Sequence, residues 1–390
     1  MENMVADHYD IIIIGGGPIG MSLSIALRGS GLSVLLLEAR ESPDKNEDPR
    51  PLAFSYGSRL ILQRLGVWES LPEITPIKTI HISNRGGLGR TLLTAKEINV
   101  PALGYVILHQ DIFQVMHKKL DDCEINYLTG AQVTQLKSDL SEGRIEFKHD
   151  GKLKQATANL LVLADGGRLT SQVDGVTQHI RDYEQKAVVS RIETSSPQCG
   201  VAYERFTSDG PVAFLPFGHN FSLVWTAPPS TVEEILDLND DEFLARLQSH
   251  FGDRAGRITS ASKRSSFPLA LKYVTPLSGC RVVLIGNAAQ TLHPVAGQGF
   301  NLGLRDAWEL SREIIAVPSD IGSSAMLSKY QAKRKADSGG GRIFTDTLVK
   351  LFSNDDILLH GIRGIGLSAL DCCPIAKRFV AKRMMFGSRG

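Results

Sequence analysis

Residues 286–306 hold the side chains and spacing best suited to chemistry in this chain. Gly286-Asn287 follows an apolar run, His293-Pro294 comes next, and Gly297-Gln298-Gly299 leads into a helical pattern that contains Asn301. A glycine-rich loop lets backbone N–H groups approach a ligand where a Cβ would obstruct them, and a helix that begins there adds the positive end of its dipole. The tract therefore predicts a site for an anion, or for a group that becomes anionic.

A second glycine motif lies near the N-terminus. Gly15, Gly17 and Gly20 stand at G-x-G-x-x-G spacing between an apolar strand pattern and a helical one, Pro18 lies within the motif, and Glu38 ends the next strand pattern. In a dinucleotide site the first glycine makes the tight turn, the second admits the pyrophosphate and the third lets the helix pack on the strand. An acid at the end of the second strand fits the unphosphorylated ribose of FAD or NAD.

Two more strand ends favour FAD over NAD. Leu160–Ala164 reads as a buried strand that ends in Asp165-Gly166, and the tract at Gly286-Asn287 reads the same way. A dehydrogenase-type NAD domain would not need further ligand-facing strand ends so far along the chain. The Asn287 amide can hydrogen-bond ribityl or phosphate oxygens.

In these three signatures the chain resembles the single-component flavoprotein aromatic hydroxylases, the p-hydroxybenzoate hydroxylase-like monooxygenases. More narrowly it resembles the UbiH/VisC family of ubiquinone-biosynthesis hydroxylases, and the sequence of residues 286–294 is most similar to that of the 2-octaprenyl-6-methoxyphenol hydroxylases. The resemblance covers nearly the whole chain. Besides the signatures, its matching segments are 49–68, 202–216, 330–334 and 345–352.

The resemblance implies an FAD-dependent monooxygenase that hydroxylates the ring of a prenylated phenol in ubiquinone biosynthesis. NAD(P)H would reduce the flavin transiently, O2 would add at its C4a carbon, and the distal oxygen of that hydroperoxide would pass to the ring. No second dinucleotide motif with strand and helix context is found, so the reductant is expected to bind without a domain of its own, or electrons arrive from a partner protein. A protein complex of quinone biosynthesis is a further expected partner.

The resemblance also implies roles for individual residues. Arg50 and Gln110 match positions that contact FAD. Gly297, Gln298 and Gly299 would stabilise negative charge on the reduced flavin, and Asn301 would hydrogen-bond near its pyrimidine edge. Pro294 would fix the turn beside the ring. His293 is a candidate base for the phenol, although a His that fills the turn before a proline is the more ordinary interpretation. No metal site is predicted.

The expected fold is α/β, with a Rossmann-like FAD-binding domain, an inserted and mainly antiparallel β-sheet substrate domain, and C-terminal helices. Strand-rich segments at 80–83, 187–192 and 212–225 alternate or run apolar as sheet does. We expect residues 1–75, 101–175 and 270–325 to form the discontinuous FAD-binding domain, 76–100 and 176–269 the substrate domain, and 326–390 the helical region. Ser338-Gly339-Gly340-Gly341 predicts a break in a helix, or a mobile spot, there.

Composition is that of a globular enzyme. The 390 residues carry 43 Lys and Arg against 42 Asp and Glu, a balance that gives no reason to expect a nucleic-acid partner. The odd count of five cysteines, without a C-x-x-C motif, favours reduced thiols in the cytoplasm. No segment approaches 18 consecutive apolar residues and the N-terminus lacks a signal-peptide pattern, so we expect neither a spanning helix nor export.

The C-terminal segment 374–386 allows two interpretations. Ile375, Phe379, Val380 and Met384 share one helical side, and four basic residues surround them. Such a helix ordinarily docks on its own domain, but it could also lie on an anionic lipid surface at the inner membrane. A membrane-dissolved prenyl substrate favours the second.

Three alternatives of other kinds stay open. A related enzyme could hydroxylate another aromatic substrate, or could reduce or halogenate instead, although the W-x-W-x-I-P signature expected of a halogenase is absent from this sequence. The chain could also be a non-catalytic flavoprotein subunit in a quinone-biosynthesis complex.

Overall fold

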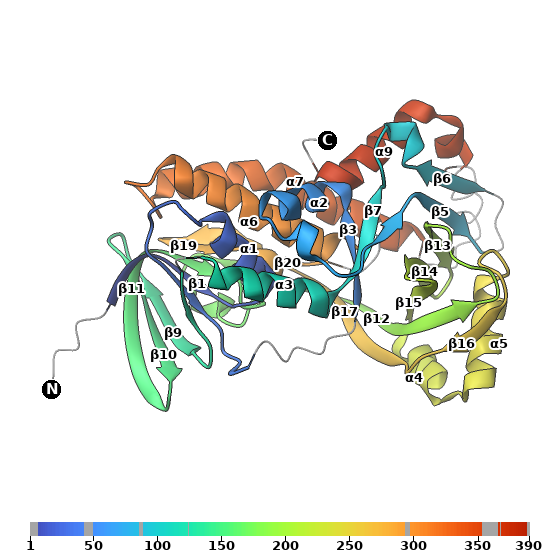
Figure 1. Ribbon diagram of the computed structural model, residues 1–390, viewed down its shortest axis with the longest axis horizontal. Coiled ribbons are helices and arrows are strands. Elements are labelled where there is room, and N and C mark those ends of the chain that lie inside the picture. The colour runs from blue at the N-terminus through green and yellow to red at the C-terminus, as the bar shows by residue number, and fades with distance from the viewer. Residues whose placement is uncertain are drawn as a thin grey trace.

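The structure is a computed structural model, and it describes residues 7–42, 50–85, 89–123, 125–292, 297–352, 366 and 368–387. Its described strands form two large sheets and one small sheet. Figure 1 shows the two large sheets at opposite ends of an elongated molecule, with long helices running along the top of the first and a C-terminal helix reaching over the second.

The first sheet has the order β18-β19-β11-β1-β2-β8, and β10 and β9 extend it from β11. Its central strands β19, β11, β1, β2 and β8 are parallel. Ile11–Ile14 are all buried, as expected of a parallel strand covered on both faces. The strands are β1 (Asp7–Ile14), β2 (Val34–Leu37), β8 (Asn126–Leu128), β9 (Gln132–Ser138), β10 (Gly143–His149), β11 (Lys152–Leu163), β18 (Ser278–Gly279) and β19 (Val282–Leu284).

Helices cover one face of this sheet. Ile11 and Ile13 pack there in a core with side chains from α1 (Pro18–Ala26), α2 (Tyr56–Arg64), α3 (His109–Asp121) and α6 (Gln298–Ala316). Ile12 and Ile14 point to the other face, where β9 and β10 supply Val133, Ile145 and Phe147. This strand–helix–strand arrangement places the turn between β1 and α1 at the carboxyl edge of the sheet, where ligands of such folds bind.

The second sheet has the order β20-β17-β12-β15-β14-β13-β5-β6, with β16 beside β12. Its pairs are antiparallel except β13 with β5. Helices α4 (Pro229–Asp237) and α5 (Asp240–Phe251) bury one of its faces around Phe214, Trp225 and Phe243. The strands are β5 (Thr79–Asn84), β6 (Arg90–Thr94), β12 (Thr177–Thr194), β13 (Val201–Thr207), β14 (Gly210–Phe217), β15 (Asn220–Ala227), β16 (Ile258–Ala261), β17 (Ser265–Thr275) and β20 (Gln290–Thr291).

The small sheet joins the two large ones. It has the order β3 (Pro51–Ser55), β7 (Gly104–Leu108) and β4 (Thr75–Ile77), all antiparallel. Ile77 and Val106 of this sheet pack against Ala202 and Phe217 of the second sheet. The chain therefore passes from the flavin-motif sheet to the second sheet through a packed connection.

The predicted helix break at Ser338–Gly341 is wrong. Helix α7 (Ser324–Phe352) runs through it without interruption. A reason lies in the packing of α9 (Pro374–Phe386) across α7: a Cβ on Gly340 would collide with the Arg383 guanidinium, which donates to the Ala336 carbonyl oxygen at 3.1 Å. The glycine gives Arg383 room to reach the helix backbone, and this contact offsets part of the cost of glycine.

The structure confirms the predicted mixed α/β fold with two large sheets. The exact domain boundaries stay a prediction, and two elements cross them. Strand β17 pairs with β12 through residue 275, past the expected boundary at 269, and β20 at Gln290–Thr291 joins the same sheet. Among the described residues no helix is long and apolar enough to cross a membrane.

Candidate flavin and substrate site

The glycine turn after β1 has the geometry that its sequence predicts. Gly15 adopts a φ of +113°, and a Cβ there would lie 2.5 Å from the carbonyl oxygen of Ala164. A Cβ on Gly20 would collide with the carbonyl oxygen of Gly15, so α1 can pack this close only with glycine. Gly17 instead faces open space, and Pro18 occupies the first turn of α1. The open side of this turn, at a helix N-terminus, fits a pyrophosphate.

Glu38 lies beside this turn, directly after β2, and is 6% exposed. One carboxylate oxygen accepts hydrogen bonds from the backbone N–H and the Nε of Arg40, both at 2.9 Å. Burial alone would raise the pKa of Glu38, but the hydrogen bonds and charge of Arg40 hold it below its ordinary value. The acid is therefore ionised and held in place, as a ribose acceptor needs to be. Arg40 was not predicted to contribute.

Asp165 shapes its own loop. Its carboxylate accepts the backbone N–H groups of Gly167 and Leu169, each at 2.9 Å. This loop abuts the first turn, because a Cβ on Gly15 would lie 2.9 Å from the Asp165 nitrogen. Gly166 adopts a φ of +76° and faces open space. The turn at Gly15 and the loop at Asp165-Gly166 are thus adjacent. A Cβ on Gly166, unlike one on Gly15, would meet no neighbouring atom, so Gly166 is the more open of these two glycines toward a ligand.

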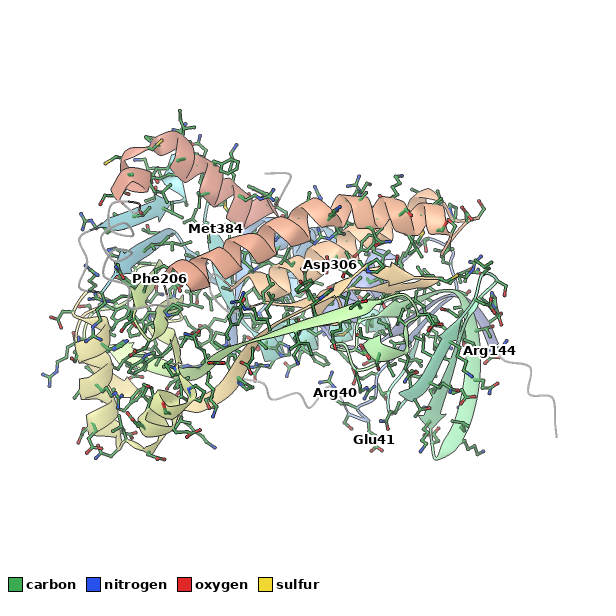
Figure 2. The ribbon with its side chains drawn as sticks, turned by 180° about the vertical axis from the view of Figure 1, so that it is seen from behind. Arg40, Glu41, Arg144, Phe206, Asp306 and Met384 are labelled. Atoms are coloured by element: carbon green, nitrogen blue, oxygen red, sulfur yellow. The ribbon has the colours of Figure 1, made fainter. Side chains whose placement is uncertain are left out.

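The strand end at Gly286 is tied to α6 by a buried network. The Gly286 N–H donates to the Asp306 carboxylate at 3.1 Å, and Arg334 of α7 donates to the same carboxylate at 2.7 Å. Arg334 and Arg305 also share Asp337 at 2.6 and 3.1 Å. Figure 2 labels Asp306 beneath the long C-terminal helices. Asn287 is exposed at this strand end, so its amide is accessible to a ligand.

Asn301 does not have the role expected of it. Its side chain is 2% exposed, and its oxygen accepts from the Ser55 N–H at 2.8 Å and the Ser58 hydroxyl at 2.6 Å. Its nitrogen donates to the carbonyl oxygens of Ala53 at 2.9 Å and Gly297 at 2.6 Å. These four bonds use every donor and nearly all acceptor capacity of the amide. Asn301 therefore fastens the start of α6 to β3 and α2 instead of reaching the flavin.

The N-terminus of α6 faces the interior of the molecule at a cavity. Gly297 adopts a φ of +59°, and Gly299 has no heavy atom near its Cβ position. Gln298, the residue between them, is buried. His293 and Pro294, the predicted catalytic residues, lie outside the described residues. The structure does show a helix N-terminus at which Gly299 is open and Gly297 packs against Ala53, and this helix end suits a group that gains negative charge.

Arg50 and Gln110 are brought together by the pairing of β3 with β7. The Arg50 carbonyl oxygen accepts the N–H of His109, the residue before Gln110, at 2.9 Å. The Arg50 guanidinium lies 6.0 Å from the centre of the Phe267 ring, at the edge of the cavity. Gln110 lies in the first turn of α3 and is half-buried. Both predicted residues thus lie on segments that border the flavin turn and the cavity.

The cavity has a volume of about 590 Å³ and separates the flavin-motif loops from the second sheet. This volume is in the range of a site for a small organic ligand. Leu370, Val380 and Met384 close it on the C-terminal side, and Figure 2 shows Met384 and Phe206 at the same end of the molecule. The sheet side is lined by Ile80, Ile82, Val189, Arg191, Ala202, Glu204, Phe206, Ala213, Leu215, Ser222 and Val224, and the flavin side by Arg50, Pro51, Leu52, Ala53, Gly297, Gly299 and Phe300.

Glu204 of β13 lines the cavity and was not among the residues predicted for the site. Burial raises the pKa of its carboxyl to about 7. The side chain keeps some accessible surface because it borders the cavity, even though packed protein surrounds it elsewhere. Strand alternation could have identified it: Ala202, Glu204 and Phe206 share one face, and an acid between two apolar residues on a sheet face is unusual.

Comparison with known proteins agrees with this geometry. The FAD binding domain family matches residues 8–338. Ubiquinone hydroxylase UbiL of Rhodospirillum rubrum is 33% identical over 96% of this chain and 89% of its own length. 3-Demethoxyubiquinol 3-hydroxylase of Escherichia coli is 30% identical over 97% of this chain and 99% of its own. The solved structure of p-nitrophenol 4-monooxygenase PnpA from Pseudomonas putida DLL-E4 has a TM-score of 0.79 at 16% identity and covers 98% of this chain and 100% of that one.

These matches confirm the predicted family, the FAD cofactor and the enzyme class. The open glycines Gly17 and Gly166, the fixed acid Glu38 and the cavity at the start of α6 are the features such a cofactor requires. The chain belongs to the FAD binding domain family of FAD-dependent monooxygenases.

Proposed function

We propose that this enzyme hydroxylates the aromatic ring of a prenylated phenol in ubiquinone biosynthesis, using O2 and a transiently bound NAD(P)H. The observation that carries the proposal is the apolar cavity of about 590 Å³ between the flavin-motif loops and the second sheet. Relatives that match nearly its full length are named ubiquinone hydroxylase and 3-demethoxyubiquinol 3-hydroxylase. A substituted phenol suits a cavity whose lining is apolar apart from a few polar groups.

The flavin, when bound, would supply an activated oxygen atom for transfer to the ring. Gly15, Gly17 and Glu38 would hold the adenosine diphosphate end, and Gly166 with Asn287 would border the middle of the cofactor. Gly297 and Gly299 would present the α6 N-terminus to the flavin ring system, where backbone N–H groups stabilise developing negative charge. The packed sheet would keep water away from the reacting atoms.

Helix α9 connects the cavity to the surface, and this suggests where a prenyl chain passes. Val380 and Met384 line the cavity, whereas Ile375 is 80% exposed and Phe379 is 67% exposed. The predicted single apolar face is therefore divided between the cavity wall and the surface. Lys377 also departs from expectation: it is 8% exposed and pairs with Glu97 at 2.9 Å and Asp371 at 3.2 Å.

We propose that this exposed part of α9 touches the inner-membrane surface as a peripheral contact. Arg378 and Lys382 are exposed close to Phe379 and could meet anionic headgroups while Ile375 and Phe379 enter the apolar boundary. Co-sedimentation with anionic vesicles tests this. Ile375→Ser/Phe379→Ser should reduce binding several-fold, whereas Leu140→Ser, a control at a side chain 88% exposed elsewhere, should not. Equal binding of all three proteins would refute the contact. An assembly with other quinone-biosynthesis proteins stays a prediction.

Turnover with a defined phenol tests the function. FAD-loaded enzyme is supplied with 2-methoxy-6-geranylphenol, NADH or NADPH, and ¹⁸O2, and the product is analysed by mass spectrometry. We expect a product that carries one ¹⁸O atom and is absent when the phenol or the reductant is omitted. Faster turnover of unprenylated phenols would point to another aromatic substrate. Bound FAD without product from any phenol would overturn the proposal and favour the non-catalytic subunit.

A further inference from the structure

A row of side chains crosses five strands of the second sheet in the cavity wall. Glu204 of β13 pairs with Ile82 of β5 on one side and with Ala213 of β14 on the other. Ala213 pairs with Val224 of β15, which pairs with Val189 of β12. All five line the cavity. Residues directly opposite one another in a sheet point to the same face, so Glu204 is the one acid in an otherwise aliphatic row.

The surroundings of Glu204 leave space next to its carboxyl and offer it no protein partner. Ala202 precedes it by two residues on the same face, and Ala213 lies opposite, so small side chains flank it on two sides. Among the described residues it has no hydrogen-bond or ion-pair partner, and burial is the cause of its raised pKa. A carboxyl that is buried without a partner destabilises the fold, and a ligand with a hydroxyl donor would supply what is missing.

Other ionisable groups along the described cavity wall make contacts with residues other than Glu204. The Arg191 guanidinium lies 4.8 Å from the centre of the Phe217 ring, and Arg50 lies over Phe267. Lys263 is exposed at the rim. The hydroxyl of Tyr203, which precedes Glu204 on β13, donates to the Arg254 carbonyl oxygen at 3.2 Å. None of these groups contributes to the pKa of Glu204.

We propose that Glu204 binds the ring hydroxyl of the substrate and acts as the base that takes its proton during oxygen transfer. This inference rests on the proposed function, because it assumes a phenol in the cavity. It assigns the base to the second sheet, on the cavity wall formed by β13, and not to the predicted His293. The wall around Glu204 is apolar, so the ring would pack against Ile82 and Val224 while its hydroxyl meets the carboxylate.

The step balances without a further reagent. The carboxylate of Glu204 takes the hydroxyl proton as the ring attacks, and the O–H electron pair is donated into the ring. A ring carbon ortho or para to that oxygen then forms the new C–O bond with one oxygen atom of O2, which NAD(P)H would reduce by two electrons through the flavin, and the O–O bond breaks. That carbon loses its hydrogen as a proton to the second oxygen atom, which leaves at the level of water. The ring becomes aromatic again, and Glu204 returns its proton to the phenolic oxygen. The carboxylate ends as it began.

Ligand binding gives a test that does not depend on turnover. The probes are 2-methoxy-6-geranylphenol and its methyl ether, which lacks the donor, and the protein is the FAD-loaded wild type, Glu204→Gln, or Glu193→Gln as an exposed control on the same sheet. A hydrogen bond to a carboxylate favours the ionised form, so the wild type should bind the phenol roughly tenfold more tightly above pH 7 than well below it. The methyl ether should show no such change, Glu204→Gln should remove it, and Glu193→Gln should keep it.

Turnover tests the proton transfer. In the wild type and in Glu193→Gln, kcat/KM should rise with pH through about 7, because the carboxylate form is the base. Glu204→Gln should lose roughly 100-fold in kcat and lack this rise, whereas Glu204→Asp should restore a rise. Flavin content and melting temperature show that each variant is folded.

The outcomes separate this inference from the function on which it rests. If the wild type hydroxylates the phenol and Glu204→Gln matches its rate and pH profile, the base is elsewhere and the hydroxylase assignment stands. If Glu204→Gln still distinguishes the phenol from its ether as a function of pH, the hydroxyl binds elsewhere and the inference is overturned. A wild type that transfers no oxygen to any phenol would remove both.

Discussion

Replacement of Glu204 by Gln should make the protein more stable at pH 8 and leave its stability at pH 4.5 nearly unchanged. The wild-type carboxyl has a pKa of about 7 in the folded protein and an ordinary value of 4.5. Between these two values the folded state binds the proton more strongly than the unfolded state does. The contribution of Glu204 to stability is therefore highest below pH 4.5 and is lost as pH rises through about 7.

The size of the effect follows from the two pKa values. A difference of about 2.5 units corresponds to about 3 kcal/mol between the low-pH and high-pH limits. Gln has similar size and no charge, so it avoids this cost at high pH. For a chain of 390 residues with an unfolding entropy of about 2.1 cal/mol/K per residue, about 3 kcal/mol corresponds to about 4 °C in melting temperature.

The assay is a series of thermal melts of the wild type, Glu204→Gln and Glu193→Gln at matched saturating FAD, from pH 4.5 to 8. The difference between Glu204→Gln and the wild type should grow with pH, in favour of the variant. The Glu193→Gln difference should stay flat, because Glu193 is exposed. A Glu204→Gln difference that is flat, or that favours the wild type at pH 8, would refute the claim that the cavity holds an unpartnered acid.

Three further perturbations follow from the structure. Gly20→Ala should retain at least tenfold less FAD after gel filtration, because its Cβ collides with the Gly15 carbonyl oxygen. Asp306→Ala should destabilise the protein by about 3–5 kcal/mol in urea melts, because it leaves Arg334 buried with one partner fewer. Burial and nearby arginines lower the pKa of His250 to about 4. The free energy of unfolding should therefore fall by about 2 kcal/mol as pH falls from 6.5 to 4, because the unfolded state takes up the proton first. His250→Gln should lack that loss in pH-dependent melts.

At the cofactor end of the site, local sequence predicted the turn geometry that the structure shows. At Gly15 and Gly20 the need for glycine comes from backbone atoms a few residues away or on the neighbouring strand, and the G-x-G-x-x-G spacing records that need directly. Glu38 follows the same logic, because a strand of fixed register brings it beside the turn. The buried strand residues Ile11–Ile14 were recognisable in the sequence as an apolar run. The geometry of such motifs can be predicted because their contacts are short-range or follow from strand pairing.

The substrate end could not be read in that way. The resemblance and the position of Asn301 at a helix start implied a role at the flavin, but its partners Ser55 and Ser58 are about 245 residues away along the chain. Only the tertiary contact of α6 with β3 shows that its amide is already fully used. Glu204 is the opposite case. An acid between two apolar residues was visible in the sequence, but its place in a cavity wall depends on the pairing of strands that carry residues as far apart as 82 and 224.

The second sheet can hold an unpartnered acid because one of its faces packs against helices and the other lines the cavity. Toward α4 and α5 it buries Phe214, Trp225 and Phe243 in a continuous aromatic and aliphatic core that stabilises the sheet independently of the cavity. The alternate residues of the same strands are then free to line the cavity, where a carboxyl that costs stability is tolerated. If the opposite core supports this cost, Phe243→Ala should lower the melting temperature of wild type and Glu204→Gln by the same amount, whereas the pH-dependent difference between them should persist. Loss of that difference in the Phe243→Ala background would mean that the cavity wall and the helix-covered core are not separable.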